Sequence, residues 1–122
     1  MAHKILVVED ERISLSLIRF GLLANRYEVL TAADGETGLN MLKSEKPDLV
    51  ILDVGLPKLN GYEFMQEMKG LDEFSHTPVI VLTANETMEQ VFKLEGIKQY
   101  YVKPVNMDQM IAKIKEYLGE NE

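Results

Sequence analysis

The sequence predicts a doubly wound α/β domain, with a five-stranded parallel sheet and helices on both faces. Short apolar runs rich in β-branched residues alternate five times with stretches of helical character. Three of these runs are continuously apolar, which is typical of strands that helices cover on both faces. Alternating strands and helices imply parallel strands joined by right-handed crossovers.

Five strands are expected in this sheet. The first, third and fourth are continuously apolar, the second alternates, and the fifth mixes polar with aromatic residues. The second and fifth should therefore be less buried, with the fifth at an edge. In chain order the expected strands are Ile5–Val8, Tyr27–Ala32, Leu49–Leu52, Val79–Leu82 and Gln99–Val102.

Helices are expected between and after these strands. In the last one, apolar residues recur at helical spacing from Met107 to Leu118. Asn106 can cap its start, and Asp108 lies in its first turn, where the helix dipole favours negative charge. Glycine, Asn-Gly and X-Pro signals delimit the shorter helices. The earlier expected helices are Glu11–Asn25, Asp34–Ser44, Tyr62–Lys69 and Thr87–Glu95.

Composition narrows the class of protein. The 122 residues leave room for one core, and 46% hydrophobic with 27% charged residues is typical of globular domains. The absence of cysteine excludes disulfides, thiolate metal sites and a cysteine nucleophile. A net charge of −7 disfavours direct binding of nucleic acid or anionic membranes. The first apolar run ends at Glu9, too short for a signal peptide or membrane span, so we expect a cytoplasmic protein.

Polar side chains follow four of the strands. They are Glu9 and Asp10 after the first, Asp53 after the third, Thr83 after the fourth and Lys103 after the fifth. Because the carboxyl ends of parallel strands share one edge, where ligands of this fold class bind, we expect these side chains to converge. Each alone has a simpler explanation, such as a helix cap or a surface lysine. Their joint placement favours a functional site.

Three carboxylates beside an ammonium suit a divalent cation and phosphoryl transfer. Carboxylates that repel one another need a cation among them, and ligands that are all oxygen favour Mg²⁺ over zinc. A carboxylate beside Mg²⁺ can attack phosphorus and form an aspartyl phosphate. Lys103 would neutralise the phosphoryl oxygens, and Thr83 would donate a hydrogen bond to one of them.

Five motifs resemble those of the receiver domains of two-component response regulators, in the same order and over essentially the whole chain. They are Val-Val-Glu-Asp-Glu at 7–11, Leu-Asp-Val-Gly-Leu-Pro at 52–57, Asn-Gly at 60–61, Leu-Thr-Ala at 82–84 and Tyr-Tyr-Val-Lys-Pro at 100–104. The resemblance implies the flavodoxin-like strand order 2-1-3-4-5. It also implies a signalling phosphoacceptor rather than an enzyme, which catalyses only its own phosphorylation and slow dephosphorylation.

The resemblance implies roles for the acidic residues. Asp53 matches the phosphoacceptor, and Asp10 and Asp53 match direct ligands of the metal. Glu9 matches a residue that reaches the metal through water, and the backbone carbonyl of Gly55 matches a further ligand. Because Gly55 has no side chain, hydrolysis of the phosphoryl group is expected to depend more on Asn85.

The resemblance also implies a switch. Thr83 and Tyr100 match the hydroxyl and the aromatic ring that change position on activation. Lys103 matches the lysine of the family, with a cis peptide at Pro104. The stretch between Thr83 and Lys103 is shorter than is usual, so the helix expected over 87–95 should be short or irregular. Val105 departs from the commoner phenylalanine.

The expected partners are a histidine kinase or histidine phosphotransfer protein as phosphodonor and a downstream protein as target. A single receiver domain is expected over residues 1–122, without an output domain unless the sequence is a fragment, and as a monomer or a phosphorylation-dependent dimer.

One alternative is a binding module of the same fold that works without phosphorylation. An FMN carrier would need a hydroxyl- and glycine-rich loop after the first strand. A phosphatase with an aspartyl intermediate would normally have a second carboxylate two residues after the nucleophile, where this chain has Gly55.

Overall fold

The strand order of the sheet is β2-β1-β3-β4-β5, with every pairing parallel, which confirms the predicted fold class. The computed structural model describes residues 2–55, 59–84 and 99–119. The strands are β1 (Lys4–Val8), β2 (Glu28–Ala32), β3 (Leu49–Asp53), β4 (Val79–Thr83) and β5 (Tyr100–Val102). The expected edge position of the fifth strand is confirmed, and β2 forms the other edge.

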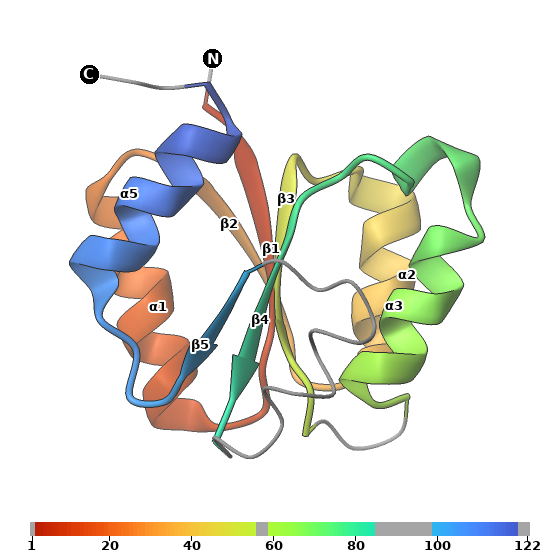
Figure 1. The fold of residues 1–122 in the computed structure, drawn as a ribbon, viewed down its shortest axis with the longest axis horizontal. Helices are drawn as coiled ribbons and strands as arrows, with labels where there is room; N and C mark the ends of the chain where they lie inside the picture. Colours follow the sequence, from red (N-terminus) through yellow and green to blue (C-terminus); the bar gives the residue numbers. More distant parts are fainter. Residues whose placement is uncertain (1, 56–58, 85–98, 120–122) are drawn as a thin grey trace.

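Helices cover both faces of this sheet. Helices α1 (Arg12–Ala24) and α5 (Met107–Tyr117) lie on one side, and α2 (Gly35–Glu45) and α3 (Gly61–Lys69) lie on the other (Figure 1). A short 3-10 helix, η1 (Asp72–Phe74), follows α3 and has no periodicity by which the sequence could predict it. In the described part of the chain, no helix has the length and apolar character needed to cross a membrane.

The central strands bury side chains on both faces, which explains their continuous apolar runs. On β1, Ile5 and Val7 pack in the core under α1 and α5, whereas Leu6 and Val8 pack in the core under α2 and α3. Strand β3 alternates in the same way, and all its apolar side chains are fully buried. At about 25 cal/mol per Å² of apolar area, this two-sided burial is the main stabilising contribution to the fold.

Element boundaries lie within one residue of the predicted ones where the structure describes them. Strands β3 and β4 extend one residue further than predicted, so Asp53 and Thr83 are the last residues of strands rather than the first of loops. The fifth strand begins at Tyr100 instead of Gln99. The helix predicted over 87–95 and the role assigned to Asn85 lie outside the described residues.

Side-chain caps fix three helix starts. Asp34 accepts a hydrogen bond from the Thr37 amide at 2.7 Å and so caps α2. Asn60 forms a reciprocal capping box with Glu63 at the start of α3. The predicted cap of the last helix is confirmed, because the Asn106 side chain accepts a hydrogen bond from the backbone amide three residues on.

Two glycines let the chain after β3 pass close to its neighbours. A Cβ on Gly61 would lie 2.5 Å from the Cα of Val54 and 2.7 Å from the carbonyl oxygen of Asp53. A Cβ on Gly35 would lie 1.6 Å from the carbonyl oxygen of Leu59. These three distances exclude a side chain at either position, so the two glycines allow the segment that follows Asp53 to run where it does.

Candidate functional site

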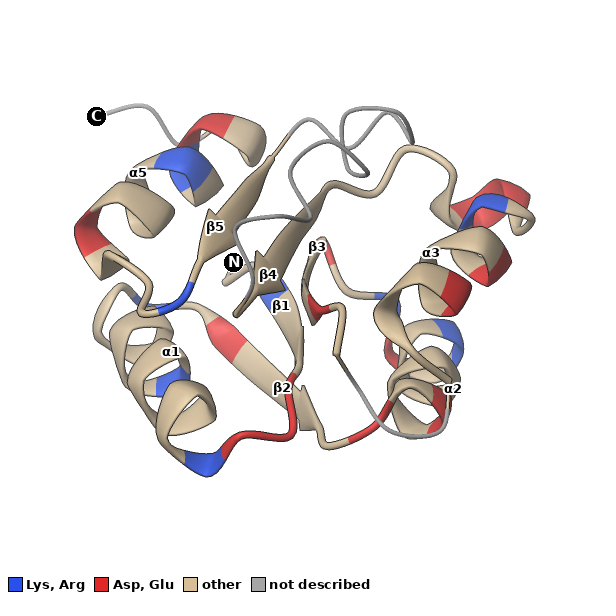
Figure 2. Cartoon of the chain, turned by 60° about the horizontal axis from the view of Figure 1, so that its bottom comes forward, with Lys and Arg blue, Asp and Glu red and all other residues tan. Residues whose placement is uncertain are grey.

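The carboxyl ends of β1, β3, β4 and β5 meet at one rim of the sheet. Figure 2 looks toward this rim and shows acidic residues after β1 and at the end of β3, with a basic residue where β5 leads to α5. Val8 pairs with Leu52 and Thr83 pairs with Val102, so the residues that follow these pairs lie side by side. The predicted set of polar strand ends therefore belongs to one edge.

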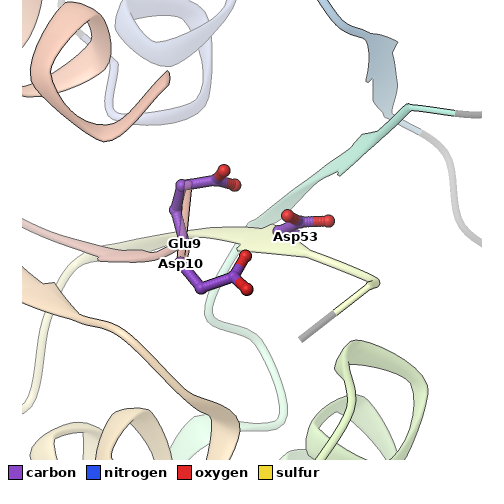
Figure 3. Close-up of side chains that lie close together, drawn as sticks. All are labelled: Glu9, Asp10 and Asp53. Atoms are coloured by element: carbon purple, nitrogen blue, oxygen red, sulfur yellow. The ribbon is translucent and has the colours of Figure 1, made fainter. Parts of the chain in front are cut away.

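Glu9, Asp10 and Asp53 form an acidic cluster at this rim. Each offers a carboxylate oxygen, and the three oxygens all lie within 4.8 Å of one another (Figure 3). Glu9 is fully buried and Asp53 is 6% exposed, whereas Asp10 faces solvent. The convergence predicted for these three carboxylates is confirmed, and all the ligand atoms are oxygen, the donors that hard cations prefer.

Lys103 lies between the carboxylates. Its Nζ donates hydrogen bonds to Oε1 of Glu9 at 2.6 Å and to Oδ2 of Asp53 at 3.0 Å. A third carboxylate oxygen, Oε1 of Glu11, lies 3.7 Å away. The lysine side chain is 14% exposed, so these charges interact with little screening by water.

The backbone positions Lys103 as well. Its amide donates a hydrogen bond to the carbonyl oxygen of Thr83 at 2.8 Å, one residue beyond the last β4–β5 pair. The peptide bond from Lys103 to Pro104 is cis. Burial lowers the pKa of the lysine, but hydrogen bonds to Glu9 and Asp53 outweigh it and raise that pKa above its ordinary value. The ammonium is therefore charged throughout the neutral pH range.

The pKa of Glu9 is raised. Burial is the largest cause that raises its pKa, the hydrogen bond from Lys103 lowers it, and contact with Asp53 raises it again, which brings it from 4.5 to about 7. Its Oε1 also accepts a hydrogen bond from the backbone amide of Glu11 at 3.2 Å. Its Oε2 is buried and has no hydrogen-bond partner among the described residues.

An unpartnered buried oxygen is costly unless another group satisfies it. A divalent cation among the three carboxylates would satisfy Oε2 of Glu9 and would remove the repulsion between Glu9 and Asp53. The donor set contains neither histidine nor cysteine, so it suits Mg²⁺ better than zinc. The residues present therefore fit a magnesium ion.

The remaining predicted site residues lie on β4, on β5 and after β3. Thr83 ends β4 with 2% of its surface exposed, and Tyr100 begins β5, where it is half-buried and paired with Val81. Gly55 contributes a contact that the sequence did not predict, because its amide donates a hydrogen bond to Oδ1 of Asp53 at 2.9 Å. The carbonyl role assigned to Gly55 stays a prediction, as do the switch roles of Thr83 and Tyr100.

Sequence reasoning missed Glu11 and Ser14. The sequence predicts Glu11 at the end of the acidic motif and at the start of the first helix, with no role in the site, yet its carboxylate lies 3.7 Å from the Lys103 ammonium. The Ser14 hydroxyl donates a hydrogen bond to Oε1 of Glu11. The signal was present in the sequence, because Glu11 directly follows the acidic pair and a serine lies one helical turn later.

Comparisons with known proteins agree with this geometry. Residues 5–115 match the family model of the response regulator receiver domain. The chain is 39% identical to the transcriptional regulatory protein PhoP of Bacillus subtilis over 124 residues, all of this chain but only 51% of PhoP. It is 32% identical to the response regulator DivK of Brucella anthropi, across 98% of this chain and 99% of DivK.

One similar solved structure contains a metal ion. The receiver domain of a sensor histidine kinase from Pseudomonas aeruginosa superimposes with a TM-score of 0.88 at 26% identity, covering 98% of this chain and 99% of that one. That crystal structure has a magnesium ion coordinated in its active-site cleft. The fold is thus shared with a domain whose crystal structure holds a magnesium ion in its active-site cleft.

Proposed function

The chain belongs to the response regulator receiver domain family, and we propose from this premise that Asp53 accepts a phosphoryl group in a Mg²⁺-dependent reaction. The phosphodonor would be the phosphohistidine of a histidine kinase or of a histidine phosphotransfer protein. The observation that carries the proposal is the convergence of Glu9, Asp10 and Asp53 beside the ammonium of Lys103. A buried carboxylate beside a fixed cation at the open rim is suited to attack on phosphorus.

Each contact at Asp53 has a use in this reaction. One carboxylate oxygen forms the new bond to phosphorus while the P–N bond of the phosphohistidine breaks, and its electron pair leaves with the imidazole nitrogen. The Gly55 amide holds Oδ1 of Asp53 at 2.9 Å and so fixes the orientation of the carboxylate. Lys103, 3.0 Å from Oδ2, neutralises charge on the transferring phosphoryl oxygens.

Mg²⁺ would be held by Asp10, Asp53, the Gly55 carbonyl and, through water, Glu9. When bound, it supplies charge neutralisation for the phosphoryl oxygens. Support for this assignment comes from the unpartnered Oε2 of Glu9 and from the magnesium site of the Pseudomonas aeruginosa domain. Asp10 is exposed and reaches the same space from the solvent side.

Signalling is proposed to follow from a shift between two conformations. The phosphoryl group would draw the hydroxyl of Thr83 toward Asp53 and change the surroundings of Tyr100, which alters a surface read by a downstream protein. The acidic net charge of −7 disfavours nucleic acid as that target. The exchange is proposed to take place in the cytoplasm, a compartment compatible with the cysteine-free sequence.

An exposed apolar stripe on α1 supports a docking surface for the phosphodonor. Ile13, Leu17 and Phe20 are 74%, 59% and 77% exposed, and their spacing places them on one side of the helix. A groove beside this stripe runs from Ile13 and Leu17 to Lys103 and Pro104. A protein seated on the stripe would therefore reach the rim that carries Asp53, so we assign the stripe to the histidine-bearing donor.

The test of the function is labelling by acetyl phosphate with Mg²⁺, read by intact-protein mass. Wild-type protein is expected to gain the mass of one phosphoryl group, and Asp53→Asn is expected to gain none. Asp108→Asn is the matched control, because Asp108 is an exposed residue in the first turn of α5. Undiminished labelling of Asp53→Asn refutes the assignment, and wild-type protein without Mg²⁺-dependent labelling favours the binding-module alternative.

A further inference from the structure

The carboxylate of Glu11 occupies a place that helix formation does not explain. Glu11 is the N-cap residue of α1, yet its side chain makes no capping hydrogen bond. Its carboxylate instead lies 3.7 Å from the Nζ of Lys103 while 58% of the side chain remains exposed. It is thus the solvent-facing carboxylate beside the ammonium that also contacts Glu9 and Asp53.

Neighbouring groups hold Glu11 in this position. The hydroxyl of Ser14 donates a hydrogen bond to Oε1, the same oxygen that faces Lys103. The backbone amide of Glu11 is tied to Oε1 of Glu9 at 3.2 Å. Glu11, Ser14 and Lys103 also line the groove that leads from α1 to the rim. A phosphodonor entering by this groove passes the Glu11 carboxylate.

The negative charge of Glu11 affects how a phosphodonor approaches the site. When a divalent cation is bound, the cation and Lys103 together balance the charges of Glu9, Asp10 and Asp53. Glu11 is then the carboxylate in excess, and it makes the entrance negative. At such separations a single charge changes the approach of an anion measurably, and salt screens the effect over about 8 Å.

Building on the proposed phosphorylation of Asp53, we infer that Glu11 is a specificity-determining residue, favouring donors whose leaving group is a protonated nitrogen over donors whose leaving group is a carboxylate. In both reactions an Asp53 oxygen forms a bond to phosphorus. With acetyl phosphate the P–O bond breaks and acetate leaves as an anion with the electron pair. With phosphoramidate the P–N bond breaks, and the already protonated nitrogen takes the pair and leaves as neutral ammonia.

The negative charge of Glu11 opposes the dianionic acetyl phosphate and its departing acetate. It attracts the positive nitrogen of phosphoramidate, as it would attract a protonated phosphohistidine. The residue thereby directs the site toward protein-borne phosphohistidine and away from free acyl phosphates.

The test compares labelling rates with acetyl phosphate and with phosphoramidate at saturating Mg²⁺ and low ionic strength, in wild type and Glu11→Gln. The variant keeps the acceptor for Ser14 but loses the charge. Its second-order rate with acetyl phosphate is expected to rise about three- to tenfold, and its ratio of phosphoramidate to acetyl phosphate rates to fall by a similar factor. Glu28→Gln removes an equal charge at the amino end of β2, on the opposite edge of the sheet, and should leave both rates unchanged.

An unchanged ratio of the two rates in Glu11→Gln overturns the inference, whatever the separate rates do. A difference in this ratio between wild type and Glu11→Gln that high salt does not reduce also overturns it, because salt must screen the effect of a charge. Failure of the underlying function has a different signature, since Asp53→Asn would then be labelled as fast as wild type by either donor.

Discussion

Lys103 donates a 2.6 Å hydrogen bond to Glu9, a residue 94 positions earlier in the chain, and this contact joins the ends of β1 and β5 across the rim of the sheet. The same ammonium holds Asp53 at the end of β3. One cation thus connects three strand ends, and both acids to which it donates hydrogen bonds are almost completely buried. The stability of the domain and the chemistry of the site therefore depend on the same few charges.

The first prediction concerns the stability of the metal-free protein between about pH 4.5 and about pH 7. In this range native Glu9, with a pKa of about 7, holds a proton that the unfolded chain has released. Stability should fall as pH rises through this window, with a slope of at most about 1.4 kcal/mol per pH unit from this group. Urea unfolding with a chelator present measures it.

Glu9→Gln is the matched variant for this measurement. It removes the titrating group, so its stability curve should lack that slope and should lie above the wild-type curve on the alkaline side of the window. A wild-type curve that rises between those two pH values, or a variant curve that keeps the wild-type slope, contradicts the account of Glu9.

The second prediction concerns Mg²⁺. Because a protonated Glu9 is a poor ligand, Mg²⁺ should stabilise the protein above about pH 7 and less below it. At a Mg²⁺ concentration about tenfold above its dissociation constant, the gain in unfolding free energy is about 1.4 kcal/mol. Thermal denaturation with and without Mg²⁺ measures the shift. Asp10→Asn should lose most of it, and an equal shift in that variant argues against the cation site.

The third prediction is that Lys103→Met separates the structural and chemical uses of the ammonium. Without it, Glu9 and Asp53 face each other uncompensated, so the variant should lose about 1 to 3 kcal/mol of unfolding free energy in alkaline solution. The loss should be smaller in acid, where Glu9 is protonated. Labelling of Asp53 by acetyl phosphate should slow on the order of 100-fold.

Lys113→Met is the control for this variant, because the ion pair of Lys113 with Glu116 lies on the exposed side of α5 and should matter little. Full labelling of Lys103→Met would show that the ammonium takes no part in phosphoryl transfer. A stability loss that is independent of pH would show that packing, rather than charge, accounts for the effect.

The fourth prediction tests the stripe on α1. Phe20→Ser should slow phosphoryl transfer from any histidine kinase or phosphotransfer protein that labels the wild type, by about tenfold or more. Labelling by acetyl phosphate should not change, because the side chain is 77% exposed and lies outside the site. Tyr62→Ser is the control on α3, where the ring is 40% exposed. Equal transfer rates in both variants would rule out the stripe as the docking surface.

The fifth prediction concerns the close approach at Gly61. An added methyl group would meet the backbone at Val54 and Asp53 at 2.5 and 2.7 Å, so Gly61→Ala should cost about 1 to 3 kcal/mol of unfolding free energy. It should also disturb labelling, since the backbone it displaces carries Asp53. Gly70→Ala is the control, because its nearest contacts are 3.5 Å or longer and its φ is −76°. Equal stability of the two variants contradicts this steric argument.

The sequence predicted the parts of this structure that depend on local pattern. Continuous apolar runs predicted the central strands, and Asn106 predicted a helix start, because burial on both faces and capping each leave a direct mark on residue choice. The carboxylates that converge could be identified because they lie at the carboxyl ends of predicted strands. Only the order of parallel strands was needed to bring Glu9, Asp10 and Asp53 together.

What the sequence could not predict is which side chain turns toward which. Glu11 lies at the start of α1 as predicted, but the sequence does not indicate that its carboxylate faces Lys103, since the orientation of a side chain at a helix start depends on tertiary contacts. The raised pKa of Glu9 has the same origin, because it depends on complete burial rather than on residue type. The amide of Gly55 is a backbone donor and leaves no trace in composition.

The 2.8 Å hydrogen bond from the Lys103 amide to the Thr83 carbonyl acts as a tether between the two strands that carry these residues. Rotation of the threonine side chain leaves the tether intact, so the hydroxyl can swing without moving the counter-charge. Sliding of the β4 terminus would instead either break this hydrogen bond or displace the backbone of Lys103. A rotation of the Thr83 side chain is therefore a rearrangement that leaves the backbone of Lys103 in place.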